Sequence, residues 1–184
     1  MNGLSRSLWL VGIVLLSFIL LSACATTSKD QAADGAVPGV YKNEEIGFTL
    51  KYPENYKHKK LSGDEVLSTY NPSQWKVPTM SASVADKQSD ELSAQGYMDA
   101  VKALNPGTKR FKVLAEKDIT LNDGTPAKVF TFKWNWTDGV TKLQSGTLIT
   151  IKGDKYISCN ATTILGGDTK PEVLQSWCES LTFE

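Results

Sequence analysis

The sequence has few of the residues on which most catalytic and metal sites depend. It contains one histidine, His58, and three cysteines, none of them in a C-x-x-C redox pair. A zinc site therefore lacks ligands, and a Ser-His-Asp triad would need His58 without a G-x-S-x-G motif to support it. The D-x-D-x-D spacing typical of calcium loops is also absent. We expect no metal, no cofactor and no enzymatic activity, and we interpret His58 as a solvated surface residue.

Neither sign of charge is in excess. Lys and Arg number 20, Asp and Glu also number 20, and the densest basic stretch is Lys57-His58-Lys59-Lys60. A nucleic-acid-binding domain carries a strongly basic face, so nucleic acid is not an expected partner. Four aspartates lie beside glycines, a pattern typical of turns. These are Asp123, Asp138, Asp154 and Asp168.

Long apolar runs are missing too, apart from one near the N-terminus at residues 8–21. It is shorter than the roughly 20 apolar residues that a bilayer-spanning helix needs. It follows a short segment whose only charge is Arg6 and precedes small residues, which is the order found in secretory signal peptides. The alternative is an uncleaved N-terminal anchor. By either route we expect the rest of the chain to be held at a membrane.

This apolar run ends in Leu21-Ser22-Ala23-Cys24, which resembles the lipobox of bacterial lipoproteins. The resemblance implies cleavage between Ala23 and Cys24 and acylation of Cys24, whose thiolate is a good nucleophile. Each buried methylene contributes about 0.8 kcal/mol to membrane binding and stable anchoring takes two signals, so a triacylated cysteine would suffice. Ala25 replaces the aspartate that tends to retain such proteins at the inner membrane of Gram-negative bacteria. The expected location is the cell envelope, and in a Gram-negative host the outer membrane facing the periplasm.

Composition divides the chain into three parts. Residues 1–23 form the expected signal peptide. Residues 24–39 comprise the lipidated cysteine and a small, polar stretch without apolar periodicity, which is typical of a flexible tether. Residues 40–184 contain no internal repeat and no second linker, so we interpret them as one domain of a size that can bury a core.

Alternating apolar residues predict a strand-rich domain. Phe48, Leu50 and Tyr52 share one face of the first strand, which ends at Pro53. The expected strands are 47–53, 65–70, 80–84, 111–121, 127–136, 141–152 and 155–164. Helical spacing predicts a mid-chain helix over 91–104 with Asp90 as its N-cap. Pro171 begins a closing helix. The expected fold class is therefore α+β.

Three segments carry a resemblance to the PsbP-like family, named for the extrinsic photosystem II subunit and similar to bacterial DcrB-type lipoproteins. They are residues 47–56, Gly153-Asp154-Lys155-Tyr156-Ile157 and Ser180-Leu181-Thr182-Phe183, and the order of elements matches over 40–184. The resemblance implies a single-domain α/β/α sandwich around an antiparallel sheet of about six or seven strands. It also implies a C-terminal helix ending at Ser180–Phe183. Tyr56 stands where the family more often has tryptophan. Its members share no single active site, so the fold assigns no function.

The two remaining cysteines fall in the last long strand and in the closing helix. An exported protein with one such pair favours a disulfide between Cys159 and Cys178. The closed loop of roughly 20 residues corresponds to about 3 kcal/mol of stabilisation in the chain-entropy model. The alternative is two buried free thiols.

A row of aromatic residues, Phe130, Phe132, Trp134 and Trp136, lies on one face of a predicted strand. The simplest interpretation is a sheet face beneath a helix. Alternatively, Trp134 and Trp136 join Trp75 in an aromatic cleft for a peptide, a glycan fragment or a lipid-like ligand. We therefore expect a non-enzymatic, lipid-anchored module that binds another envelope protein or supports assembly. The alternative is an envelope ligand-binding protein or hydrolase that uses the cleft.

Overall fold

The computed structural model describes residues 39–72 and 78–184, all of which belong to one compact unit, Ala32–Glu184. The expected signal peptide, Ala23, Cys24, the tether up to residue 38 and Trp75 lie outside the described residues. The elements in chain order are β1 Val40–Asn43, β2 Phe48–Lys51, β3 Lys57–His58, β4 Glu65–Tyr70, β5 Thr79–Asp86, α1 Ala94–Leu104, β6 Lys109–Thr120, β7 Pro126–Asn135, β8 Lys142–Lys152, β9 Lys155–Ile164, α2 Pro171–Cys178 and β10 Thr182–Phe183.

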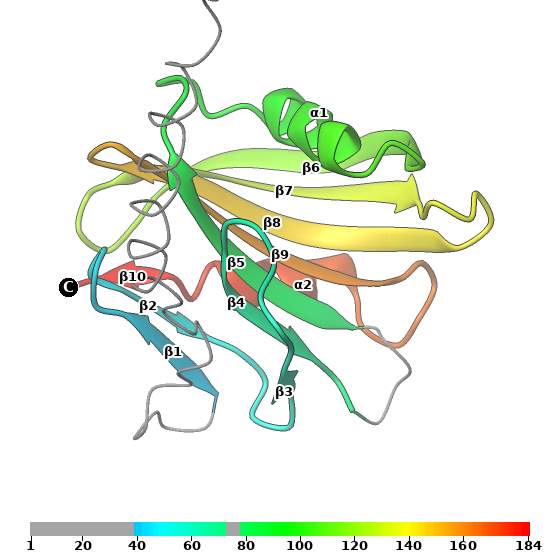
Figure 1. Cartoon of the computed structure of the whole chain (residues 1–184), viewed down its shortest axis with the longest axis horizontal. Helices are drawn as coiled ribbons and strands as arrows, with labels where there is room; N and C mark the ends of the chain where they lie inside the picture. Colours follow the sequence, from blue (N-terminus) through cyan, green and yellow to red (C-terminus); the bar gives the residue numbers. More distant parts are fainter. Residues whose placement is uncertain (1–38, 73–77) are drawn as a thin grey trace, which may run out of the picture. The chain divides into compact units, whose positions relative to one another are not determined.

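A seven-stranded sheet in the order β3-β4-β5-β9-β8-β7-β6 dominates the unit, and its neighbouring strands are all antiparallel (Figure 1). A second sheet has the order β1-β2-β10. The α+β class and the central antiparallel sheet of seven strands are confirmed. Neither described helix has the length and apolar character that crossing a bilayer requires.

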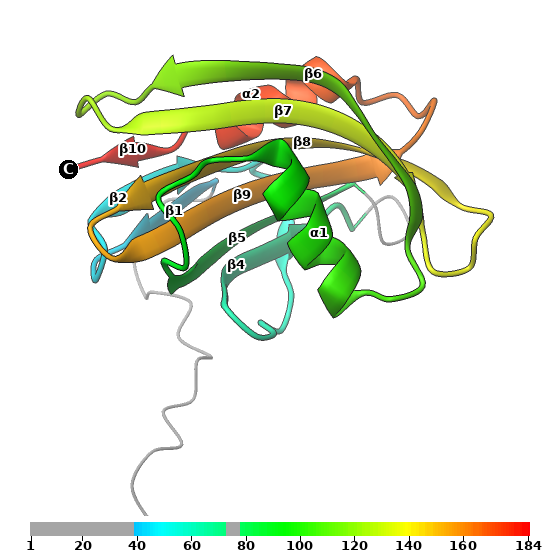
Figure 2. The same cartoon turned by 90° about the horizontal axis from the view of Figure 1, so that it is seen from above.

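Two hydrophobic cores lie on opposite faces of the large sheet. Because successive strand residues point to opposite faces, Val129 of β7 belongs to one core and Phe130 to the other. The first core lies between the large sheet, α2 and the small sheet, with Leu148 and Leu174 fully buried. The second lies beneath α1, which contributes Met98. Figure 2 shows α1 and α2 on the two sides of the sheet, as the sandwich architecture requires.

The predicted start of α1 was wrong by one turn. Asp90 is not the N-cap, and its carboxylate lies 2.7 Å from Lys87 Nζ. The helix begins at Ala94, and the Ser93 side chain caps it by accepting a hydrogen bond from the Gly96 N–H at 3.2 Å. Serine is among the preferred N-cap residues, so the local chemistry explains the shorter helix.

The predicted end of the closing helix was also wrong. α2 stops at Cys178, and Thr182–Phe183 forms β10, which pairs with β2. The side chain of Asn122, in the β6–β7 turn, binds the backbone of β10. Its Nδ2 donates to the Phe183 carbonyl at 2.9 Å, and its Oδ1 accepts from the Phe183 N–H at 3.0 Å. The C-terminal strand is thus held by a side chain 61 residues earlier in the chain.

Asn122→Ala should lower the free energy of unfolding by about 1–2 kcal/mol, because it leaves two backbone groups of Phe183 without their partner. Urea denaturation of the purified protein measures this change. Asn55→Ala, at an exposed position, is the matched control and should change stability by less than about 0.5 kcal/mol. Equal stabilities for the two variants would contradict the bridging role of Asn122.

Candidate functional site

The aromatic row of β7 is largely a sheet face covered by α1. The Tyr97 ring of α1 meets Phe130 edge-on with centroids 5.5 Å apart, and Phe111 of β6 stacks on Trp134 at 5.6 Å. Trp134 is only 7% exposed, and its indole N–H donates to the Ser145 hydroxyl at 3.1 Å. Burial raises the pKa of the Tyr97 hydroxyl. This side of the sheet is therefore a packed aromatic core with its polar atoms satisfied.

The tryptophans of the hypothetical cleft have different environments. Trp136 lies just beyond the end of β7 and is 43% exposed, whereas Trp134 is buried. Their ring centroids are 5.5 Å apart. Trp75 lies outside the described residues. The structure brings Trp134 and Trp136 together, but the cleft of three tryptophans stays a hypothesis.

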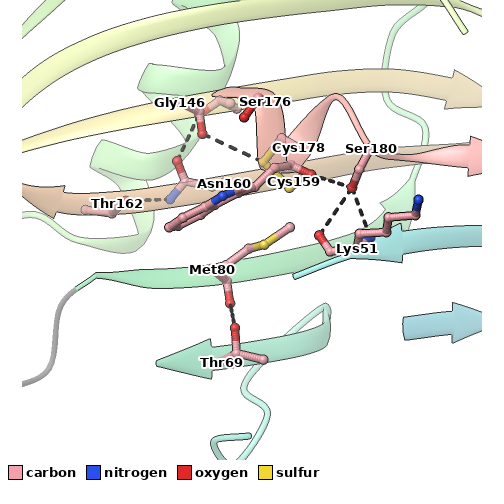
Figure 3. The surroundings of a disulfide bond; sticks show 12 residues. Lys51, Thr69, Met80, Gly146, Cys159, Asn160, Thr162, Ser176, Cys178 and Ser180 are labelled. Atoms are coloured by element: carbon pink, nitrogen blue, oxygen red, sulfur yellow. Dashed lines mark hydrogen bonds between the residues drawn. A yellow bond between two sulfur atoms is a disulfide. The ribbon is translucent and has the colours of Figure 1, made fainter. Parts of the chain in front are cut away.

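The disulfide expected between Cys159 and Cys178 is present (Figure 3). It joins the middle of β9 to the last residue of α2, with the two Cα atoms 5.4 Å apart. Both cysteines are fully buried in the first core, and Cys178 Sγ lies 3.8 Å from the Gly146 carbonyl oxygen. Redox-active cysteines are partly exposed, so the arrangement fits a structural cross-link.

The close approach of α2 to the large sheet depends on Gly146 of β8. A Cβ atom at this position would lie 2.3 Å from the backbone nitrogen of Gln175 and 2.7 Å from its Cα. Both obstacles are backbone atoms, which cannot rotate away. Sequence reasoning missed this residue, although a glycine inside a strand is a signal of close backbone approach.

A shallow cavity of about 230 Å³ lies where the β1–β2 turn approaches the end of β5. Its lining includes Glu45, Asp64, Asp86 and Lys155. Lys155 Nζ lies 2.7 Å from the Asp86 carboxylate, and this contact lowers the pKa of Asp86. Within residues 39–72 and 78–184, no three His, Cys, Asp or Glu side chains gather as metal ligands would. The cavity therefore combines one ion pair with two further carboxylates, Glu45 and Asp64, on an open surface.

His58 lies exposed on β3. Its Nε2 is 3.0 Å from the Tyr52 hydroxyl, and the two rings meet edge-on at 5.5 Å. A catalytic base is normally oriented by an acid or a carbonyl and faces a nucleophile. The contact of His58 with a tyrosine from the neighbouring loop is instead typical of a surface packing interaction.

Comparison with solved structures identifies the architecture. The solution structure of cyanobacterial PsbP (CyanoP) from Synechocystis sp. PCC 6803 superposes with a TM-score of 0.63, covering 84% of this chain and 98% of that one. The domain has the PsbP-like fold. Sequence identity to CyanoP is 13%, so the likeness shows the fold alone.

Two other structures are less similar. A protein from Bacteroides thetaiotaomicron gives a TM-score of 0.48 at 15% identity, covering 80% of this chain and 49% of its own. A protein of unknown function from Pseudomonas aeruginosa gives 0.39 at 17% identity, covering 74% of this chain and 85% of its own. No protein-family model and no curated protein matches the sequence.

Proposed function

We propose that the chain is a bacterial envelope lipoprotein whose PsbP-like domain is a non-enzymatic interaction or assembly-support module. The observation that carries the proposal is Leu21-Ser22-Ala23-Cys24 directly after a short apolar run. The buried Cys159–Cys178 bond supports export, because disulfides persist in oxidising compartments and are rare in the cytosol. Acylated Cys24 would then hold the domain at a membrane.

The side-chain chemistry of the described residues supports a module that binds rather than catalyses. His58 contacts the Tyr52 hydroxyl, and Asp86 pairs with Lys155. The Trp134 indole stacks on the Phe111 ring. A catalytic centre needs a nucleophile or base held within hydrogen-bond reach of its orienting groups. The partner we propose is another envelope protein.

In this proposal, the tether expected at residues 24–39 would set how far the domain can reach. A polar linker of about 15 residues spans roughly 20 Å on average, following the square-root dependence of a flexible chain on length. A domain on this tether could contact proteins embedded in the same membrane as well as the membrane surface. The proposed role thus needs no enzymatic turnover and requires only that the domain be attached to the membrane that holds its partner.

Cys24→Ala should abolish labelling of the protein by a palmitate analogue in cells and move it from the membrane fraction to the soluble fraction. Ser22→Ala is the matched control, since it keeps a small residue before the cleavage point and should leave labelling and fractionation unchanged. Unchanged fractionation and labelling of Cys24→Ala would contradict lipidation. Cross-linking in intact cells, compared between the wild type and Cys24→Ala, then identifies the partner.

A further inference from the structure

One end of the large sheet gathers three chain segments that are distant in sequence: residues 104–112, 133–142 and 164–170. We call this surface the hairpin end. Figures 1 and 2 agree in placing the α1–β6 connection, the β7–β8 hairpin and the end of β9 at this side. A Cβ atom on Gly107 would lie 3.0 Å from Thr137 Cβ, and the Leu165 N–H donates to the Lys142 carbonyl at 2.9 Å. The three segments therefore form one continuous surface.

The hairpin end carries most of the exposed large apolar side chains of the described residues. Two of them protrude almost fully: Leu104 is 82% exposed and Val140 is 80% exposed. Leu114 and Val173 lie outside the three segments, on β6 and α2. The five at the hairpin end are Leu104, Trp136, Val140, Ile164 and Leu165. Exposed apolar side chains that cluster in this way mark interaction surfaces.

The same surface is basic in a chain whose total charge is zero. Its three segments hold six cations and two acids, which gives 6 − 2 = +4. The ion pairs found among the described residues use other lysines, so these six cations have no carboxylate partner there. Of the two acids, Asp138 accepts hydrogen bonds from backbone N–H groups of its own turn. The cations are Lys109, Arg110, Lys112, Lys133, Lys142 and Lys170.

Backbone geometry singles out one of these cations. Arg110 has a φ of 58°, and among the described residues it is the only non-glycine residue with a positive φ. It lies where the pairing of β6 with β7 shifts register between Lys109 and Lys112. Irregularities of this kind at a sheet edge bend the strand and redirect a side chain, which here is one of the six cations.

We propose that the hairpin end is a membrane-contact surface for bilayers that contain anionic phospholipids. Tryptophan and protruding aliphatic side chains partition into the interfacial layer, and surrounding lysines and arginines bind the phosphate groups above it. The apolar residues lie at the end of α1, in the β7–β8 connection and at the end of β9, and a deformable lipid surface can accommodate side chains that project from separate segments. This inference does not depend on acylation of Cys24, because the contact residues all lie in the folded unit.

The test uses the unit Ala32–Glu184, which contains both hydrophobic cores and the disulfide and carries no lipid. We expect it to sediment with vesicles made of equal parts phosphatidylcholine and phosphatidylglycerol and not with phosphatidylcholine alone. Lys109→Gln/Lys112→Gln/Lys142→Gln should weaken binding roughly a hundredfold. The charge-matched control Lys57→Gln/Lys60→Gln/Lys117→Gln should change it by less than about threefold.

The apolar contribution is tested separately. Leu104→Ser/Val140→Ser alters two highly exposed positions, so the fold is kept, and it should weaken vesicle binding at least about tenfold. Leu114→Ser/Val173→Ser, with both side chains exposed but outside the three segments, is the control and should bind like the wild type. A blue shift of tryptophan emission on adding vesicles should disappear in Trp136→Phe. Absence of vesicle binding, or equal losses in the variants and their controls, would overturn the proposal and leave the surface to a protein partner.

Discussion

Gly146→Ala is expected to prevent α2 from docking on the large sheet. The new methyl group would meet the backbone of Gln175 at 2.3 Å, and the carbonyl carbon of Leu174 lies 2.7 Å away. Overpacking of a core usually costs about 1–3 kcal/mol. Here the obstacle is the main chain of a helix rather than a flexible side chain. We therefore expect a loss of about 3 kcal/mol or more in the free energy of unfolding.

Urea denaturation of the purified unit, followed by circular dichroism, measures this loss. Gly96→Ala is an informative control, because its Cβ would meet only the Ser93 side chain at 3.6 Å or beyond. Gly96 lies exposed inside α1, where alanine is favoured over glycine by about 0.5–1 kcal/mol. The two substitutions should thus change stability in opposite directions. A Gly146→Ala variant as stable as the wild type would contradict the tight α2 contact.

Removal of the disulfide has the second large expected effect. Cys159 and Cys178 are 19 positions apart, and closing a loop of that size stabilises the fold by about 3 kcal/mol through restriction of the unfolded chain. Cys159→Ala/Cys178→Ala should therefore lower the free energy of unfolding by about this amount. It also removes two sulfur atoms from a fully buried site.

Reductant provides the control for this measurement. It should lower the urea midpoint of the wild type and leave that of Cys159→Ala/Cys178→Ala unchanged, because only the wild type has a bond to break. Thiol titration of the unfolded wild-type unit should find no free thiol before reduction. Two free thiols, or a midpoint insensitive to complete reduction, would contradict the cross-link.

The two effects are coupled, because both residues fix the same helix. Cys178 Sγ lies 3.8 Å from the Gly146 carbonyl, and the disulfide holds the C-terminal end of α2 to β9 (Figure 3). Substitutions that share a structural element are rarely additive. Once Gly146→Ala has displaced α2, loss of the disulfide should cost less than it does in the wild type.

Long strands and their turns were predictable from the sequence because their signals are local. The bounds of β4 and β9 coincide with the predicted 65–70 and 155–164, where apolar alternation is flanked by glycine or polar turn residues. The short strands β1, β3 and β10 were not identified as strands. Two to four residues carry no periodicity, and their conformation is set by a partner strand rather than by intrinsic preference.

The candidate site was predictable only in part, because much of it depends on contacts between segments that are distant in sequence. Pairing of Cys159 with Cys178 followed from the expected compartment and the number of cysteines. The role of Gly146 depends on where a helix from another part of the chain crosses it. The positive charge of the hairpin end could not be predicted from the sequence, because its cations are spread over three distant segments and the net charge of the whole chain is zero.

Lipidation of Cys24 is decided by mass spectrometry of the mature amino terminus, on protein isolated from the membrane fraction of its own host. We expect a chain that begins at Cys24 and carries the added mass of a diacylglyceryl group, with a third acyl chain where the host adds one. An unmodified amino terminus on protein released freely into the medium would contradict it.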